Sequence, residues 1–312
     1  MKICAACNQA LSNDKFSKKQ WQLKQRRRCK KCIADKREVN LDAARNGTQL
    51  PDNREAKLSE ALPKEGPTTD SECVPSLTDE DLFKQPAPRD ECPICMLPLR
   101  SREKGYRVCC GKVICHGCSY AIRTTDNNRA LCPFCRSPDI TTDEFIERIK
   151  KRVKGDDAVA ICHLGGKYYR GRDGLPHDYE KGIKLFLRAG ELGNAMAYYN
   201  VATAYVYGEG VERDETKAKH YYGLAAMGGY ERARHNLGIM EAQDGNAVRA
   251  VKHWMIAAGA GHDESLKKIR EFFSDGHATK DDFEKALRAH KDAQDAMRSD
   301  QREVAATFHG QL

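Results

Sequence analysis

The chain has 312 residues, enough for two or three domains of ordinary size. Its mean hydropathy is −0.71 and no stretch approaches the ~20 apolar residues that a membrane-spanning helix requires, so we expect no contact with a membrane. The formal charge of +8 is unevenly distributed: residues 1–40 carry twelve Lys or Arg and three acidic side chains, whereas residues 41–91 carry six and twelve. The basic character therefore belongs to the N-terminal segment.

The first residues, Met-Lys-Ile-Cys-Ala-Ala-Cys, lack the apolar stretch of a secretory signal. We therefore expect an intracellular protein, in the cytoplasm and/or the nucleus, where cysteines stay reduced. Twelve of the 14 cysteines lie in two groups before residue 136, largely as Cys-x2-Cys pairs. In a reducing compartment this spacing predicts zinc ligation, because two thiolates on one tight turn can bind the same tetrahedral ion.

The first group of cysteines predicts one Zn²⁺ site within residues 1–40. Its ligands would be Cys4, Cys7, Cys29 and Cys32. Between the two pairs the chain carries Leu11, Phe16-Ser17-x-x-Gln20 and Arg27, an order that resembles the Stc-one-type domain. In fungi that LIM-like finger bridges RNA-silencing and chromatin-modifying complexes. The resemblance implies a small ribbon-like zinc fold.

Residues 15–37 carry eleven Lys or Arg, with Phe16 and Trp21 among them. They are a candidate surface for nucleic acid, because cationic side chains contact phosphates and aromatic rings stack on bases. Two alternatives remain open. In the first, the segment docks a protein. In the second, Phe16 and Trp21 fill the core of the finger and the charged side chains stay solvated.

Residues 41–88 have the composition of a disordered acidic linker. Six of the eleven prolines fall in this segment, and Phe83 is its one aromatic residue. Such a composition buries too little apolar surface to offset the entropy lost on ordering. The leucines of residues 76–82 leave a short docking helix as the alternative there.

The second group of cysteines lies in residues 89–140 and supplies eight thiols, enough for two tetrahedral zinc sites. In chain order they are Cys92, Cys95, Cys109, Cys110, Cys115, Cys118, Cys132 and Cys135. A segment of this length builds only a small hydrophobic core, so bound metal must contribute much of its folding energy. Four ligands per ion leave no open position for a catalytic water.

This octet resembles the RING family, and most nearly its all-cysteine variants. The resemblance implies a cross-brace, in which the first and third pairs hold one Zn²⁺ while the second and fourth hold the other. It also implies a short helix after the third pair, at about residues 119–124. Two zinc ions would then be bound here, and a third in the N-terminal finger.

The second pair, Cys109-Cys110, departs from the Cys-x-Cys or Cys-x-His of that family, and Lys112 stands where a histidine is usual. An ammonium group cannot ligate a metal ion. Either both adjacent thiols bind one zinc, or one of them is spare and His116 replaces it.

RING domains of ubiquitin ligases hold a ubiquitin-charged conjugating enzyme and promote transfer by positioning. By resemblance, the contacts with that enzyme would come from Ile94, Pro133 and Phe134, with Arg136 bridging enzyme and ubiquitin. A guanidinium suits such a bridge because its donors have fixed geometry. The alternatives are that Ile94 and Phe134 pack in a small core and that Arg136 is merely solvated.

Residues 158–292 are repetitive. Gly174 and Gly210 are 36 residues apart, as are Asp178 and Asp214, and helical segments ending in Gly193, Gly229 and Gly261 follow a similar interval. A period in this range indicates stacked pairs of helices. The unit at 197–229 is the clearest, with Asp214 expected to cap its second helix.

These repeats resemble the Sel1-like family, which is related to tetratricopeptide repeats. The resemblance rests on Gly208, Gly210, Val211, Asp214, Lys217, Ala218, Ala225, Ala226 and Gly229. In the preceding unit it rests on Leu164, Gly165, Tyr169, Gly171, Gly174, Asp178 and Lys181. It implies an α-solenoid that binds a protein ligand or spaces other domains. Residues 263–290 are either a fourth unit or a capping helix pair, and residues 293–312 form a polar C-terminal tail.

The predicted fold class is therefore multidomain: small zinc-stabilised modules, a ribbon-like finger and a cross-brace RING, followed by an all-α helical-repeat solenoid. The leading functional hypothesis is a RING-type ubiquitin ligase or ligase subunit without a covalent catalytic residue of its own. Its partners would be a ubiquitin-conjugating enzyme and a protein ligand of the repeats. The alternative is a non-catalytic zinc-binding scaffold, associated with nucleic acid or chromatin through the basic finger.

Overall fold

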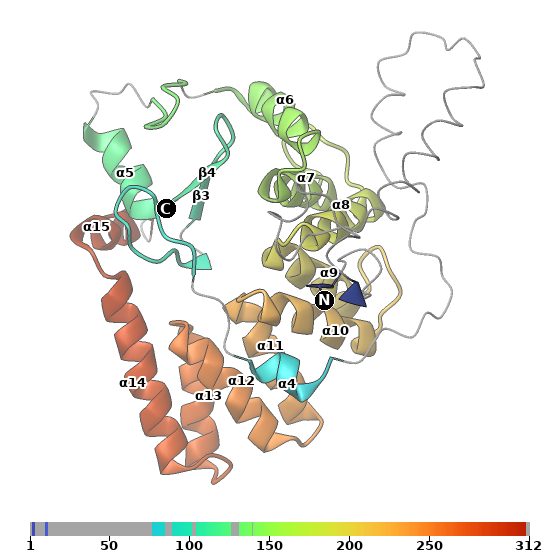
Figure 1. The fold of residues 1–312 in the computed structure, drawn as a ribbon, viewed down its shortest axis with the longest axis vertical. Helices are drawn as coiled ribbons and strands as arrows, with labels where there is room; N and C mark the ends of the chain where they lie inside the picture. Colours follow the sequence, from blue (N-terminus) through green and yellow to red (C-terminus); the bar gives the residue numbers. More distant parts are fainter. Residues whose placement is uncertain are drawn as a thin grey trace. The chain divides into compact units, whose positions relative to one another are not determined.

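The structure is a computed structural model that describes residues 2–3, 10–11, 77–84, 89–101, 104–125, 131–138 and 140–309. It divides into two compact units, residues 1–61 and 62–312 (Figure 1). In the first unit, strands β1 (Lys2–Ile3) and β2 (Ala10–Leu11) pair antiparallel, with Lys2 opposite Leu11. The proposed zinc ligands of this unit and the basic segment 15–37 lie outside the described residues.

The second unit contains the segment that we call the cysteine module, residues 89–138. Its strands β3 (Lys104–Arg107) and β4 (Lys112–Cys115) form an antiparallel hairpin in which Lys104 lies opposite Cys115. Helix α5 (His116–Thr125) follows β4 directly. The helix expected at residues 119–124 is therefore present, and it begins three residues earlier because the chain turns into it at the Cys115–Cys118 pair.

Helix α6 (Thr142–Val153) connects the cysteine module to the repeats. It starts with a capping box, in which the Thr141 hydroxyl accepts from the Glu144 N–H and the Glu144 carboxylate accepts from the Thr141 N–H. Its Ile146 and Ile149 are buried. The segment between the two predicted domains is thus a packed helix with an apolar face.

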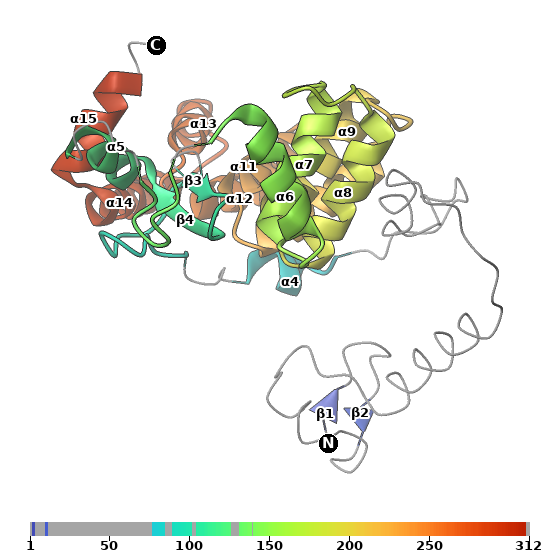
Figure 2. The same cartoon turned by 90° about the horizontal axis from the view of Figure 1, so that it is seen from above.

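Six helices of near-equal length form what we call the repeat array, residues 158–259. They are α7 (Ala158–Arg170), α8 (Tyr179–Glu191), α9 (Ala195–Tyr207), α10 (Glu215–Met227), α11 (Glu231–Gln243) and α12 (Ala247–Gly259). They pack most closely in the pairs α7–α8, α9–α10 and α11–α12 (Figures 1 and 2). The predicted helical-repeat architecture is confirmed.

The turns of the array explain the sequence period. Asp178 and Asp214, 36 residues apart, each accept a hydrogen bond from the backbone N–H three residues on and so begin α8 and α10. Gly193 and Gly229 follow α8 and α10 with φ of 95° and 83°, a left-handed conformation that side chains disfavour. These two aspartates and two glycines are therefore helix-end residues.

Two helices and a final short one follow the array: α13 (Asp263–Ser274), α14 (Lys280–Met297) and α15 (Asp300–His309). The first two pack on each other and on α12, closing the end of the array. The expected boundary at residue 293 falls within α14. Residues 300–309, which we assigned to a polar tail, form α15, which packs on α5 of the cysteine module (Figures 1 and 2).

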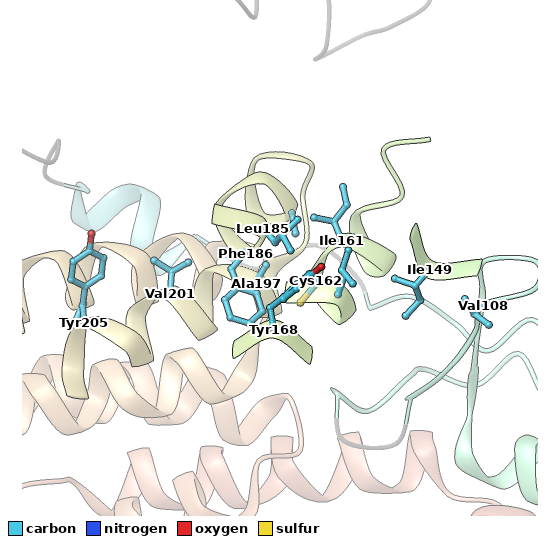
Figure 3. Packing of buried hydrophobic residues seen from close by; sticks show 13 residues of the cluster. Val108, Ile149, Ile161, Cys162, Tyr168, Leu185, Phe186, Ala197, Val201 and Tyr205 are labelled. Carbon is cyan, nitrogen blue, oxygen red and sulfur yellow. The ribbon is translucent and has the colours of Figure 1, made fainter. Parts of the chain in front are cut away.

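One hydrophobic core joins the cysteine module to the array. Val108 of the module and Ile149 of α6 belong to the same cluster of buried residues as Ile161, Leu164 and Phe186 of the first repeat. Figure 3 shows this row of side chains running from Val108 to Tyr205. The described residues between 89 and 309 therefore belong to one packed unit.

Helix α4 (Asp79–Phe83) occupies part of the segment predicted to be a disordered linker. It is the short docking helix that the leucines left as the alternative to disorder. It lies against α10, with Leu82 buried. The other residues of that segment, 41–76 and 85–88, lie outside the described residues. Among the described helices, none has both the length and the apolar character that crossing a membrane requires.

Candidate metal centre

The eight cysteines of the module gather into two groups of four. One group consists of Cys92, Cys95, Cys115 and Cys118, and the other of Cys109, Cys110, Cys132 and Cys135. Within each group all Sγ atoms lie within 4.8 Å of one another. The two groups interleave along the chain, as the cross-brace hypothesis expects. We call them the first and the second quartet.

Two similar turns supply half of the thiols. In the first, the Cys92 N–H donates to the Leu97 carbonyl (2.9 Å) and the Met96 N–H donates to the Cys92 carbonyl (2.8 Å). In the second, the Cys132 N–H donates to the carbonyl five residues on (2.8 Å) and the Arg136 N–H donates to the Cys132 carbonyl (2.9 Å). Met96 and Arg136 each have a φ of 58°, which turns the chain back after the second cysteine. Each Cys-Pro-x-Cys sequence thus forms a tight knuckle.

The spacing of the sulfur atoms suits a tetrahedral ion. Four sulfurs at ~2.3 Å from a central Zn²⁺ would lie about 3.8 Å from one another. The Sγ atoms of Cys95 and Cys115 are 3.8 Å apart, and those of Cys110 and Cys132 are 3.7 Å apart. Four soft sulfur donors at this spacing can hold a metal ion in each quartet.

The thiols within each quartet differ in acidity. Burial raises the pKa of Cys92, but N–H groups of Cys115, Cys95 and Ile94 donate to its sulfur and bring the pKa down to about 6. The same balance gives Cys132 a pKa of about 7. Burial and the neighbouring sulfurs of Cys132 and Cys135 raise the pKa of Cys109 to about 12. Each knuckle therefore offers one thiolate readily, and the other thiols lose their protons when an ion binds.

The adjacent Cys109 and Cys110 both belong to the second quartet. His116 begins α5 and is in neither quartet. Lys112, which stands where the resembling family has a histidine, is exposed on β4. The geometry therefore favours the hypothesis in which both neighbouring thiols bind one ion.

The residues expected to contact a conjugating enzyme lie on the surface of the two knuckles. Ile94 is 41% exposed and Phe134 is 38% exposed, Arg136 is exposed, and Pro133 is half-buried. The core of the module is formed by Leu99 and Ile114 together with buried cysteines. Ile94 and Phe134 are thus not needed to fill that core, which leaves their side chains available to a partner.

Arg302 reaches the first quartet from α15 and was not among the predicted site residues. Its guanidinium donates to the carbonyls of Pro98 (2.9 Å), Leu97 (3.3 Å) and Met297 (3.1 Å), and to Cys95 Sγ at 3.6 Å. It is only 7% exposed. A cation beside the thiols stabilises their ionised form. No local pattern marks this residue, because its partners in the cysteine module are some 200 positions away.

The contact between α15 and α5 is close because of a glycine. A side-chain carbon at Gly117 would lie 2.8 Å from Cγ and 2.9 Å from the backbone nitrogen of Arg302. Only a residue without a side chain permits this approach. The sequence signal is therefore Gly117 in the first turn of α5, between Cys115 and Cys118.

Comparison with known proteins identifies the family of the repeats. Residues 158–194 and 195–230 match the Sel1 repeat family, so the array contains Sel1 repeats. Among curated proteins, the chain is 30% identical over 133 residues to the ERAD-associated E3 ubiquitin-protein ligase component HRD3B of Arabidopsis thaliana. This match covers 42% of the chain and 20% of that relative.

Two solved structures are also similar to the chain. A Sel1 repeat protein from Oxalobacter formigenes is 28% identical, with a TM-score of 0.44 over 49% of this chain and 64% of its own. A protective antigen of uropathogenic Escherichia coli strains, c5321, which displays an SLR fold, is 27% identical, with a TM-score of 0.42 over 50% and 33%. The chain spans less than two thirds of each of these relatives.

Proposed function

We propose that this chain is a zinc-dependent ubiquitin ligase or ligase subunit. In this proposal the cysteine module binds a ubiquitin-charged conjugating enzyme and the Sel1 repeats bind a protein partner. The observation that carries it is the pair of interleaved quartets, which hold two knuckles with Ile94 and Phe134 exposed at their surface. This is the arrangement of ligands and apolar contacts that the resemblance to RING domains implies.

Zinc is the ion that fits the quartets. Closed sites of four thiolates are typical of structural Zn²⁺, and such an ion contributes folding energy instead of chemistry. The module buries few apolar side chains besides its cysteines. Bound zinc would thus stabilise the knuckles, and the chain's own residues would perform recognition.

Transfer of ubiquitin would then proceed without a nucleophile from this chain. A lysine of the substrate attacks the thioester on the conjugating enzyme, and the cysteine module contributes by holding that enzyme in the reactive arrangement. Arg136 lies on the second knuckle, with a left-handed backbone and an exposed side chain. Its several donors suit a bridge between enzyme and ubiquitin.

The repeats supply the protein-binding part of the proposal. Sel1 repeats are stacked helix pairs whose surfaces bind other proteins, and the Arabidopsis relative is named as a component of a ubiquitin ligase. Because the cysteine module and the first repeat share one core, a partner on the repeats would be held at a fixed position relative to the knuckles. This rigidity also suits a scaffold without ligase activity, which is the second candidate.

The test is discharge of ubiquitin from a panel of charged conjugating enzymes by the full chain. The full chain is required because α6 and α15 pack on the cysteine module. We expect accelerated discharge that Ile94→Ala reduces by about tenfold or more, since an exposed apolar anchor is lost from an interface. No acceleration with any conjugating enzyme, from protein whose quartets are loaded with zinc, would leave the scaffold.

The matched pair of variants is Arg136→Gly and Met96→Gly. Both residues have a φ of 58°, so glycine relieves backbone strain at either knuckle and should not weaken the fold. We expect Arg136→Gly to lower the discharge rate by about tenfold, because it removes a charge-assisted contact, while Met96→Gly retains the rate. Equal rates for the two variants would remove Arg136 from the proposed mechanism.

A further inference from the structure

Helix α4 lies in a groove on the repeat array, which we call the α4 groove. The groove is lined by Tyr222, Gly223, Tyr230, Arg234, Arg249 and His253 of α10, α11 and α12 and the turn between α10 and α11. Leu82 is buried there beside Tyr222 and Tyr230, and Leu77 packs so closely on Gly223 that a methyl group at that position would collide with it. A five-residue helix is thus held by apolar side chains inserted into the array.

The groove and the helix are also complementary in charge. Asp79 forms an ion pair with Arg249, and Arg249 and Lys252 lie over the ring of Phe83, at 5.4 Å and 5.6 Å from its centroid. The His253 ring also contacts Phe83, with the two ring centroids 4.7 Å apart. An acidic first turn followed by an aromatic side chain therefore matches a basic groove.

Arg234 at the base of the groove carries donors that α4 leaves unpaired. The side chain is 2% exposed, and its Nη1 donates to the carbonyl of Leu82. Its Nε and Nη2 have no hydrogen-bond partner among the described residues, and no described carboxylate forms an ion pair with it. A buried guanidinium with a single carbonyl partner is costly unless an anion joins it.

His253 adds a third unpaired donor beside Arg234. It is fully buried, and its Nδ1 is 3.4 Å from Arg234 Nη1. Because the guanidinium can only donate, Nδ1 accepts, and the hydrogen of the neutral ring is on Nε2, which has no partner among the described residues. Arg234 and His253 together form a site for a carboxylate that α4 does not supply.

We propose that the α4 groove binds a short acidic helix of a partner protein, with a carboxylate against Arg234 and His253, and that α4 is an internal segment that occupies the groove in the partner's absence. A five-residue helix is too short to be stable by itself, so it can leave the groove without unfolding the array. The inference rests on the protein-binding part of the proposed function and is independent of ubiquitin transfer.

The first experiment measures binding of a fluorescein-labelled peptide of residues 77–84 to the full chain by anisotropy. In the double variant Leu77→Ser/Leu82→Ser of the chain, the internal segment should no longer compete. We expect it to bind the peptide about tenfold more tightly than the unmodified chain does, because a tethered segment competes at an effective concentration in the millimolar range. Equal affinity of the two chains would overturn the proposal that α4 is an internal competitor.

Charge reversal tests whether the peptide uses the same groove. In the Leu77→Ser/Leu82→Ser background, Arg249→Glu should weaken the peptide by about fivefold, and a peptide carrying Asp79→Lys should recover that loss. Asp79 is exposed, whereas Arg249 is partly buried and also pairs with Glu241, so the fold of the Arg249→Glu variant is checked by circular dichroism. Failure of the reversed pair to recover affinity would place the peptide elsewhere.

The last experiment addresses the carboxylate. A peptide of residues 77–82 with a free C-terminus places a charged group at the Leu82 carbonyl, next to Arg234, whereas its amide does not. We expect the free acid to bind about tenfold more tightly than the amide, since a hydrogen bond to a charged partner is roughly twice as strong as a neutral one. Arg234→Met should abolish that difference, with its thermal unfolding checked by circular dichroism. Equal binding of acid and amide by the unmodified groove would contradict the carboxylate site.

Discussion

The cysteine module and the repeat array are stabilised by different means. In the module, β3, β4 and α5 surround two cysteine quartets, and Leu99 and Ile114 are the buried core residues besides cysteines. In the array, every helix buries several side chains against its neighbours, and one cluster continues through α7, α8 and α9. The module should therefore depend on bound metal and the array on apolar packing. Val108 and Ile149 belong to the core that the module and the array share. Their packing determines whether the module can unfold while the array stays folded.

Removal of the metal should have the largest effect and should separate the two regions. A structural zinc contributes on the order of 10 kcal/mol per site, more than the small core of the module can replace. We expect a strong chelator to abolish amide protection in residues 104–125 while residues 158–259 stay protected in hydrogen exchange. Cys92→Ser and Cys132→Ser should each remove one bound ion, and Cys162→Ala, a buried cysteine outside the quartets, should remove none. Loss of protection throughout would show that the shared core makes one cooperative unit.

Removal of a large side chain from the array is the reciprocal experiment. Trp254 is 1% exposed, its indole donates to the His235 carbonyl at 3.1 Å, and its ring meets Phe272 edge-on. Trp254→Ala should lower the free energy of unfolding of the array by about 3–5 kcal/mol, because it leaves a cavity. The metal content should be unchanged. Release of metal from this variant would contradict the separation of the two regions.

Arg302 of α15 joins the cysteine module to the end of α14, and its loss should act on the first quartet. Arg302→Ala removes donors from the carbonyls of Pro98 and Leu97 and a cation from the first quartet, with an expected cost of about 3 kcal/mol. Transfer of metal from the first quartet to a coloured chelator should become faster. The matched control is Arg298→Ala, since Arg298 is an exposed residue whose ion pair with Glu303 lies at the surface. Equal rates for both variants would contradict a stabilising role of Arg302.

Local features of both regions could be predicted from the sequence. The two knuckles depend on ligands two residues apart, and the helix ends depend on Asp178, Asp214 and Gly229, so short-range spacing was sufficient. The resemblance to RING domains implied that Cys109 and Cys110 share one site, with His116 as the alternative to one of them, and the structure places both cysteines in one quartet. The N-terminal zinc site and the basic segment stay predictions.

Contacts between distant segments could not be predicted. The bond from Arg302 to Pro98 joins residues 204 positions apart, and that from Arg234 to Leu82 joins residues 152 apart. No sequence period or motif marks either contact, because each contact forms only when two folded elements pack face to face. The composition of the linker indicated disorder, and its acidic and apolar residues at 77–83 gain order only from the basic groove that receives them.

Acidification should lower the free energy of unfolding of the array, by less than the substitutions above. Burial, with Arg234 and Arg249 nearby, lowers the pKa of His253 from its ordinary 6.5 to about 3, so the folded array keeps this ring neutral. The unfolded chain takes up a proton below pH 6.5, and the stability contributed by the neutral ring is therefore full above pH 6.5 and falls as the pH falls toward 3. Between pH 6.5 and 5 the expected loss is about 2 kcal/mol.

This loss can be measured by urea unfolding with Trp254 as the reporter, in a Trp21→Phe background that leaves it the single tryptophan. His253→Gln removes the titrating ring while keeping a side-chain amide, so its stability should change less between pH 7 and 5 than that of the parent. The cysteine module should respond to acid by a separate route, through protonation of its thiols and release of metal. If His253→Gln retained the full pH dependence, the loss would come from another buried group such as His235, whose pKa burial also lowers, to about 4.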